Sequence, residues 1–221
     1  MITTSRKLKT IALTAAIALA SVLNANRAEA RDMQTITVAG GCFWCVEADF
    51  EKVRGVEEVP SGYTGGTTAN PTYREVTAGG TGHYEAVEIA YDADQVSARQ
   101  IYDLFFRSID PTDAGGQFCD RGDSYRTAIF VSNAAEQQIA QASLNAAQSE
   151  LGRQIVTPIL SLAAFYDAED YHQDYYKGQD RLITRAGVKT QAEAYDFYRE
   201  ACRRDQRVEQ LWGSDAPFIN Q

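Results

Sequence analysis

The stretch TITVAGGCFWCVEADF, residues 35–50, decides the fold and places the first reactive side chain. Its first five residues alternate as in a half-buried strand, two glycines interrupt the pattern, and apolar residues then recur at helical spacing from Phe43. The stretch therefore predicts a strand, a tight turn and an amphipathic helix. Cys42 begins that helix, where free N–H groups and the helix dipole favour the thiolate over the thiol. Cys202 fits a buried structural cysteine better.

Residues 1–30 have the pattern of a secretory signal peptide: basic residues, the apolar stretch 11–23, and Ala28-Glu29-Ala30 before Arg31. The apolar stretch is too short to span a bilayer of about 30 Å as a helix. We therefore expect an exported protein, periplasmic or secreted, with no membrane segment after signal cleavage. An uncleaved N-terminal anchor is the alternative.

The chain is acidic, with 21 Lys and Arg against 30 Asp and Glu. Residues 1–30 hold four of the basic residues and one of the acidic ones, so their removal changes the formal net charge from −9 to −12. Nucleic-acid binding depends on clustered Lys and Arg, so we expect no nucleic-acid partner. For the same reason we expect no adhesion to anionic membranes.

Residues 31–221 are expected to form a single catalytic domain, with a C-terminal extension from about residue 190 to 221. A chain of about 190 residues with ordinary apolar content builds a full core without disulfides. The four cysteines could still form two structural bridges. Cys42 and Cys45 have, however, the Cys-x-x-Cys spacing associated with redox chemistry, and we interpret them as catalytic.

Alternating and helical patterns continue along the chain. They predict strands at 56–63, 86–91, 126–132 and 155–163, and helices at 98–108, 134–151 and 191–203. The order strand, helix, strand, strand, helix, strand predicts an α/β (α+β) fold, a two-layer sandwich with a mixed β-sheet and a split β-α-β core. A tail with Leu211, Trp212 and Phe218 is expected to pack back on the core.

Five motifs follow one another in a fixed order. They are GCFWCVE at 41–47, GYTGG at 62–66, NPTYREV at 70–76, GHYE at 82–85 and DRGDSYRT at 120–127. Together they resemble the A-type peptide methionine sulfoxide reductases, over about residues 39–130 and more weakly to the tail. The resemblance implies reduction of the S epimer of methionine sulfoxide, free or in oxidised proteins. It also implies that no cofactor is used and that a thioredoxin-like dithiol supplies the electrons. We expect a monomer.

The resemblance implies a role for each motif residue. Cys42 would attack the sulfoxide sulfur, and Glu85 would be the general acid, its pKa raised by burial beside aromatic side chains. Tyr73 and Tyr125 would hold the sulfoxide oxygen by hydrogen bonds. Asp120 would orient water or polar groups of the substrate.

Phe43 and Trp44 adjoin the nucleophile and offer an aromatic wall for the methyl group of the sulfoxide. Plain core packing is the other interpretation of Phe43. We expect His83 and His172 to be structural rather than proton carriers.

A sulfenic acid left on Cys42 needs a second thiol to resolve it as a disulfide. Many relatives have Gly at the position of Cys45. We choose Cys45 because it lies one turn along the same helix. Cys202 comes next, as resolving thiol or as a relay that passes the disulfide to the surface, and Cys119 is the third candidate.

Two other functions use the same cysteines. A general thiol-disulfide oxidoreductase would need only the pair Cys42 and Cys45 at a helix start. A structural zinc module would bind the metal with this pair and His83 or Cys119. The oxidoreductase would not need Glu85, Tyr73 or Tyr125, and for the zinc module the sequence has no second closely spaced ligand pair.

Overall fold

The computed structural model of the protein describes residues 31–219. The predicted signal peptide lies outside the described residues, so its cleavage and the export of the protein stay predictions. The elements from Met33 onward belong to one unit of the chain. Within the described residues, every helix is too short or too polar to cross a membrane.

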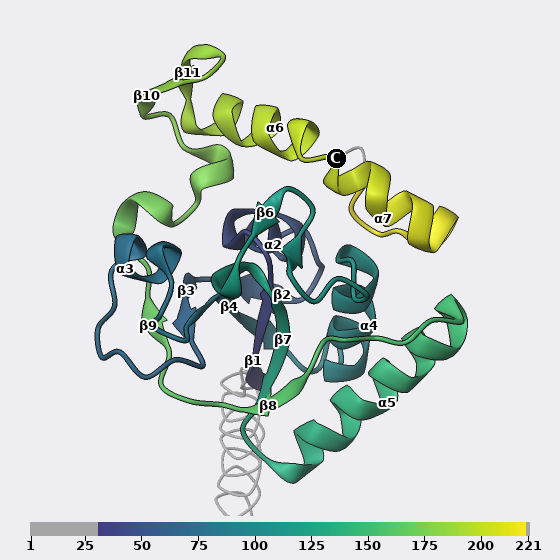
Figure 1. Cartoon of the computed structure of the whole chain (residues 1–221). Helices are drawn as coiled ribbons and strands as arrows, with labels where there is room; N and C mark the ends of the chain where they lie inside the picture. The colour runs from purple at the N-terminus through teal and green to yellow at the C-terminus, as the bar shows by residue number, and fades with distance from the viewer. Residues whose placement is uncertain (1–30, 220–221) are drawn as a thin grey trace, which may run out of the picture. The chain divides into compact units, whose positions relative to one another are not determined.

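A seven-stranded mixed sheet forms the centre of this unit (Figure 1). The strand order is β8-β7-β1-β4-β3-β9, with β2 also paired to β4; neighbours are antiparallel except β7 and β8. Strand β1 lies in the middle, between β4 and β7, so the residues that follow β1, including Cys42, lie at an end of the central strand. The bounds are β1 Met33–Gly40, β2 Val56–Glu58, β3 Ser61–Thr64, β4 Tyr84–Asp92, β7 Thr127–Val131, β8 Ile159–Ser161 and β9 Tyr166–Asp167.

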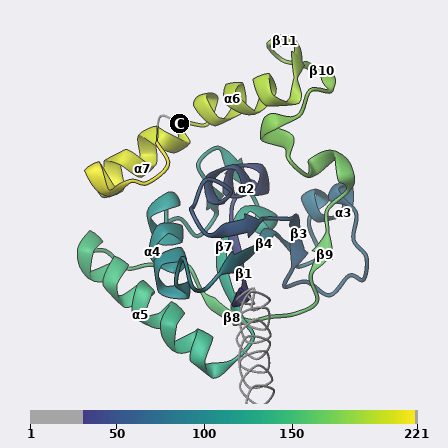
Figure 2. The ribbon, with the colours of Figure 1, turned by 180° about the vertical axis from the view of Figure 1, so that it is seen from behind.

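Three helices pack beside this sheet. Helices α2 (Phe43–Phe50) and α4 (Ala98–Ser108) contact β1, and α5 (Ala134–Leu151) packs against α4 and β7 (Figure 2). The bounds of α4 and α5 agree with the sequence prediction because local capping fixes both starts. The side chains of Ser97 and Asn133 accept hydrogen bonds from N–H groups of the first turns.

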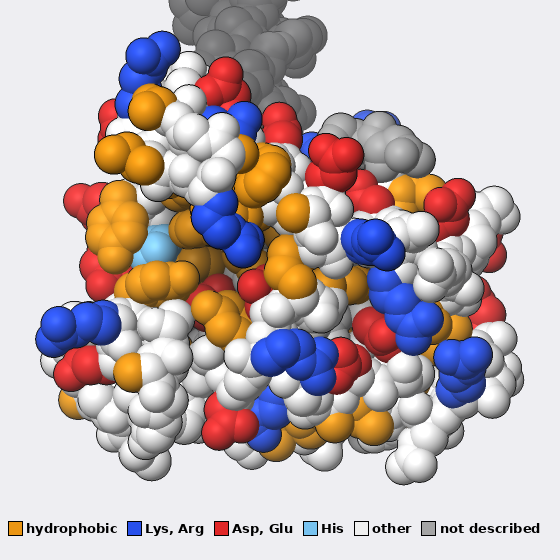
Figure 3. Space-filling view, turned by 45° about the horizontal axis from the view of Figure 1, so that its top comes forward, with side chains coloured by type: hydrophobic (Ala, Val, Ile, Leu, Met, Phe, Trp, Pro, Cys, Tyr) orange, Lys and Arg blue, Asp and Glu red, His pale blue; other side chains and the backbone are white. Residues whose placement is uncertain are grey.

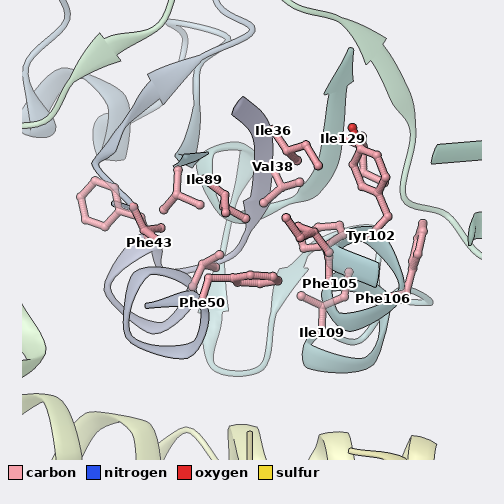
Figure 4. Packing of buried hydrophobic residues seen from close by; sticks show 14 of the residues in the cluster. Ile36, Val38, Phe43, Phe50, Ile89, Tyr102, Phe105, Phe106, Ile109 and Ile129 are labelled. Carbon is pink, nitrogen blue, oxygen red and sulfur yellow. The ribbon is translucent and has the colours of Figure 1, made fainter. Parts of the chain in front are cut away.

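The main core lies between the sheet and the helices. Ile36 and Val38 of β1 point to the same face and meet Phe50 of α2 and Phe105 of α4 (Figure 4). All four side chains are at most 1% exposed. A smaller apolar cluster, which includes Phe130 of β7, lies apart from this core. The fold class predicted from the strand and helix order is confirmed.

Short elements build the loops around the site. The strand predicted at 56–63 is divided into β2 and β3, with Pro60, which cannot donate a ladder hydrogen bond, between them. The other short elements are α3 Tyr73–Ala78, β5 Gly116–Gln117, β6 Asp120–Arg121 and the 3-10 helices η1 Asp123–Tyr125, η2 Asp170–His172, η3 Tyr175–Lys177 and η4 Gly213–Asp215.

The C-terminal segment differs most from the prediction. It contains the hairpin β10 (Arg181–Thr184) and β11 (Gly187–Thr190) and two helices, α6 (Gln191–Ala201) and α7 (Arg204–Trp212). The single predicted helix ends early because Arg203 has a left-handed φ of 56°, and the predicted tail forms α7. As expected, the apolar residues of this tail include buried members of the main core.

Candidate active site

The turn between β1 and α2 places Cys42 at the N-cap of α2. Gly41 has φ 85°, and a Cβ there would lie 2.5 Å from Cβ of Gln117, so only glycine fits this turn. The helix begins at Phe43, whose N–H is the first free donor of α2. The sequence prediction of a cysteine at a helix start is therefore correct.

The two free thiols of the chain form one pair on α2. The N–H of Cys45 donates to the carbonyl of Cys42 at 3.1 Å, and the two thiols share a hydrogen bond. That hydrogen bond lowers the pKa of Cys45 to about 7, although burial opposes it; Arg204 and Arg199 lower the pKa further. The resting thiolate of the pair is thus favoured on Cys45.

The pKa of Cys42 moves the other way. Its hydrogen bond with Cys45 and its burial raise this pKa, and the charges of Glu85 and Asp120 add to the effect. The direction of this shift is opposite to the one expected from the position of Cys42 at a helix start. The first N–H of α2, on Phe43, is donated to Oε2 of Glu85 at 3.1 Å, so this N–H stabilises the carboxyl.

Glu85 lies in β4 and is only 1% exposed. Burial raises its pKa to about 8, although the Phe43 N–H opposes the shift. Its Oε1 atom is buried and has no hydrogen-bond partner among the described residues. The carboxyl is therefore protonated at neutral pH and is available as a proton donor.

The two tyrosines come from separate loops and meet at the same cavity. Tyr73 is the first residue of α3, fixed by a capping box between Thr72 and Glu75 and by its N–H, which donates to Glu169 at 2.9 Å. Tyr125 is the last residue of η1. Burial raises the pKa of both hydroxyls, which interact with each other, so both stay protonated.

One cavity of about 360 Å³ joins these side chains. Figure 3 shows one face of the molecule, on which hydrophobic side chains gather around a hollow with a histidine among them. The predicted site residues that line the cavity are Cys42, Phe43, Trp44, Cys45, Tyr73, Glu85, Cys119, Asp120, Tyr125 and Cys202. All the catalytic, resolving and substrate-binding residues predicted for the sulfoxide reductase site therefore line one cavity.

Cys119 and Cys202 form a disulfide at the edge of this cavity, with 4.9 Å between their Cα atoms. Cys119 is exposed and precedes β6, and Cys202 is half-buried between α6 and α7. The bond ties the C-terminal segment to the loop that carries Asp120. Cys202 is thus a disulfide-bonded, half-buried residue, whereas the sequence favoured a buried structural cysteine.

The aromatic wall is built by stacking. Trp44 lies flat on Tyr175, with ring centroids 3.7 Å apart, and its Nε1–H donates to Nδ1 of His172. Burial lowers the pKa of His172 to about 4, so its ring is neutral and supports the wall. Phe43 packs on the same histidine, with ring centroids 5.0 Å apart.

The residues needed for a zinc module are engaged elsewhere. Nδ1 of His83 accepts the N–H of Gly66, and Nε2 contacts the carbonyl of Thr68 at 2.7 Å. Cys119 is bonded to Cys202. Neither candidate third ligand is therefore available beside Cys42 and Cys45, and the zinc hypothesis has lost its support.

Sequence reasoning missed the contribution of the C-terminal segment. The side chains that it adds to the cavity are Tyr175, Leu182, Arg185, Tyr195, Tyr198, Arg199 and Arg204. Their signal in the sequence is the density of tyrosine and arginine between residues 171 and 204, which indicates an amphipathic surface but not where that surface docks.

The site is that of a thiol-based oxidoreductase: two free thiols, a protonated buried carboxyl and two tyrosines around one open cavity. The family model for peptide methionine sulfoxide reductase matches residues 34–206. The chain therefore belongs to the peptide methionine sulfoxide reductase family, and it catalyses the reduction of methionine sulfoxide. This membership sets aside the general thiol-disulfide oxidoreductase.

Individual relatives agree over most of the chain. The peptide methionine sulfoxide reductase MsrA 2 of Rhizobium meliloti is 47% identical over 189 residues, which is 86% of this chain and 88% of the relative. The MsrA enzyme of Limosilactobacillus reuteri is 44% identical over 184 residues, 81% of this chain and 97% of its own. Among solved structures, reduced Mxr1 from Saccharomyces cerevisiae has a TM-score of 0.63 at 31% identity, over 66% of this chain and 84% of that one.

Proposed function

We propose that the chain reduces the S epimer of methionine sulfoxide, free or in oxidised proteins, with Cys42 as the nucleophile. The observation that carries the proposal is the placement of Cys42 and the protonated carboxyl of Glu85 in one cavity. A sulfoxide accepts a sulfur nucleophile only if its oxygen receives a proton, because oxide is a very poor leaving group. The cavity supplies both groups.

The groups of the site supply and accept the protons that the first step moves. Cys42 passes its proton along the hydrogen bond to Cys45 as its sulfur attacks the sulfoxide sulfur, and Glu85 protonates the sulfoxide oxygen. The hydroxyl group then moves to the cysteine sulfur as the sulfur–oxygen bond of the substrate breaks. Methionine leaves, Cys42 is oxidised to a sulfenic acid, and the carboxylate takes a proton back from solvent.

The polar groups of the cavity have supporting roles. The hydroxyls of Tyr73 and Tyr125 donate hydrogen bonds to the oxygen as negative charge develops on it. Asp120 orients water or polar groups of the substrate near them. Phe43 and Trp44 hold the methyl group by contact with their rings.

Cys45 then resolves the sulfenic acid. Its sulfur attacks Cys42, the sulfur–oxygen bond breaks, and the hydroxyl leaves with the Cys45 proton as water. The state of the four cysteines supports this choice. Cys42 and Cys45 are free thiols that share a hydrogen bond, whereas Cys119 and Cys202 form a disulfide with each other. The latter two can resolve or relay only after their own bond is reduced.

An external thioredoxin-like dithiol returns the enzyme to its reduced form, and no cofactor takes part in this scheme. Cys119 is exposed whereas Cys45 is 9% exposed, so the partner reaches the second pair more easily than the first. We also propose that the protein is exported, on the basis of residues 1–30, and that it acts as a monomer. N-terminal sequencing of protein from the extracytoplasmic fraction tests the export.

Turnover of the separated S and R epimers of a blocked methionine sulfoxide, with dithiothreitol as reductant, tests the proposed reaction. We expect the S epimer to be consumed and the R epimer to remain. Equal consumption of the two epimers would contradict the stereochemical assignment, and consumption of neither would contradict the reaction.

A further inference from the structure

A buried ion network lies one helical turn beyond Cys45. Asp49 of α2 is 1% exposed, and its Oδ1 lies 2.9 Å from Nη1 of Arg199 in α6. Its Oδ2 lies 3.7 Å from Nε of Arg204 in α7. Because residues four apart share a helix face, the two guanidinium groups gather on the face of α2 that carries Cys45.

The two arginines are held rigidly. Arg204 is 2% exposed, and its Nη1 and Nη2 atoms donate to the carbonyls of Gly40 and Ser108 at 3.3 and 3.0 Å. The side chain of Arg199 is 11% exposed and donates to the hydroxyl of Tyr195 at 2.9 Å. Buried charges are costly unless they are compensated. Nε of Arg204 has no hydrogen-bond partner among the described residues and faces Oδ2 of Asp49 as an ion pair at 3.7 Å.

Both arginines line the catalytic cavity together with Cys45. The ring of Tyr195, which Arg199 holds, belongs to the same apolar cluster as Cys45. The titratable or charged groups that surround Cys45 from the packed elements are Cys42 and Asp49, Glu85 of β4, Asp120 of β6, Tyr175 and Tyr176 of η3, Arg185 of the β10–β11 hairpin, Tyr195, Tyr198 and Arg199 of α6, and Arg204 of α7. Two of the three cations in this set, Arg199 and Arg204, come from the C-terminal helices and pair with Asp49.

We propose that Arg199 and Arg204 are positioning residues for the resolving step, in which they hold Cys45 as a thiolate beside Cys42. This role rests on the proposed function, since it takes Cys45 as the resolving thiol. A thiolate on Cys45 accepts the Cys42 proton in the first step, and Cys45 gives that proton to the leaving hydroxyl as its sulfur attacks the sulfenic sulfur in the second. The cation pair favours both events because it stabilises the anionic form of Cys45.

The thiolate on Cys45 can be measured without catalysis. In the Cys42→Ser background, Cys45 is the single free thiol, because Cys119 and Cys202 are bonded. Iodoacetamide alkylates the thiolate, so the alkylation rate at each pH, measured by mass spectrometry, gives the fraction of Cys45 that is deprotonated. Arg199→Gln and Arg204→Gln should each raise the midpoint of this pH profile by about one pH unit, so the alkylation rate at neutral pH falls by roughly tenfold.

Matched variants separate charge from structure. Asp49→Asn removes a negative charge from the same network and should move the midpoint downward, opposite to the arginine variants, whereas general loosening would move all of them the same way. Arg199→Lys keeps the charge and should stay near the parent. Arg207→Gln removes another ion pair between α7 and the body, with Asp110 at 2.7 Å, outside this cavity, and should leave the midpoint unchanged.

The same substitutions in the enzyme with all four cysteines complete the test. The pH profile of Cys42–Cys45 disulfide formation, after one equivalent of sulfoxide, should shift with the alkylation profile. Unshifted alkylation in both arginine variants would overturn the proposal while leaving the proposed reaction intact. A shift in alkylation without a shift in disulfide formation would overturn the role of the arginines in resolution while leaving Cys45 as the resolving thiol.

Discussion

The two cysteine pairs reach the same cavity by different routes. Cys42 and Cys45 are three residues apart on one helix, and their approach is set by local helix geometry. Cys119 and Cys202 are separated by 83 residues and meet only because α6 and α7 fold back over the body. The local pair is sheltered and remains as two thiols, whereas the long-range pair is more open and is bonded. The difference agrees with the proposal that the first pair carries out the chemistry and that the second is reached by an external dithiol.

The largest effect is expected from loss of the proposed nucleophile. Cys42→Ser should abolish methionine sulfoxide reduction with dithiothreitol, because no other thiol occupies the N-cap of α2. Release of methionine measures the activity, and circular dichroism controls for the fold. Substantial residual turnover would mean that another cysteine does the chemistry.

The next largest effect is expected from loss of the Glu85 carboxyl. Glu85→Gln should slow the first turnover by roughly 10²-fold at neutral pH, the usual scale for a lost general acid. Because burial raises the pKa of Glu85 to about 8, the wild-type rate should be highest below that pH and fall as pH rises through it. Quenched single turnovers across pH measure this profile. An unchanged rate in the variant would remove Glu85 from its role.

A smaller effect is expected from the hydroxyls opposite the thiols. Tyr73→Phe and Tyr125→Phe should each cost about twofold in the first turnover, and the double variant about tenfold or more, because each hydroxyl can partly replace the other. A double-mutant cycle measures the coupling. Strict additivity would show that the two hydroxyls do not share the sulfoxide oxygen.

Cys45→Ser should leave the amount of methionine released in the first turnover unchanged and alter the fate of the oxidised Cys42. Without a resolving thiol, the sulfenic acid on Cys42 should persist long enough to be trapped with dimedone. Mass spectrometry detects the adduct. If the variant closes a disulfide as fast as the parent, and loss of Cys119 or Cys202 causes the stall instead, the long-range pair resolves the reaction.

The smallest effect on the first turnover is expected from the long-range pair itself. The double variant Cys119→Ala and Cys202→Ala should lower the free energy of unfolding by about 2–5 kcal/mol, because the bond closes a long loop in the unfolded chain. Urea unfolding measures the loss. An unchanged stability would mean that the C-terminal segment is held by its side-chain contacts alone.

The sequence predicted the features that depend on neighbouring residues. The starts of α4 and α5 follow from the side chains of Ser97 and Asn133, and the strand-to-helix turn follows from the glycines before Cys42. The motif order also nominated the residues of the cavity, although it came from resemblance and not from geometry.

The sequence did not predict the features that depend on contacts between residues far apart in the chain. The pairing of Cys119 with Cys202, and the placement of Arg199 and Arg204 beneath α2, are set by the docking of α6 and α7, which no local pattern encodes. The resting charge on Cys45 was missed for the same reason. The lowered pKa of Cys45 depends first on its hydrogen bond with Cys42 and then on these two arginines.

The bond between Cys119 and Cys202 also bears on proteolysis. The tip of the β10–β11 hairpin, which includes the exposed Arg185, lies between the two cysteines in the sequence. Exposed loop tips are preferred sites of cleavage. A single cut there leaves two fragments that stay covalently joined and migrate as one band on a non-reducing gel, so the nicked enzyme keeps its C-terminal helices until a reductant releases them.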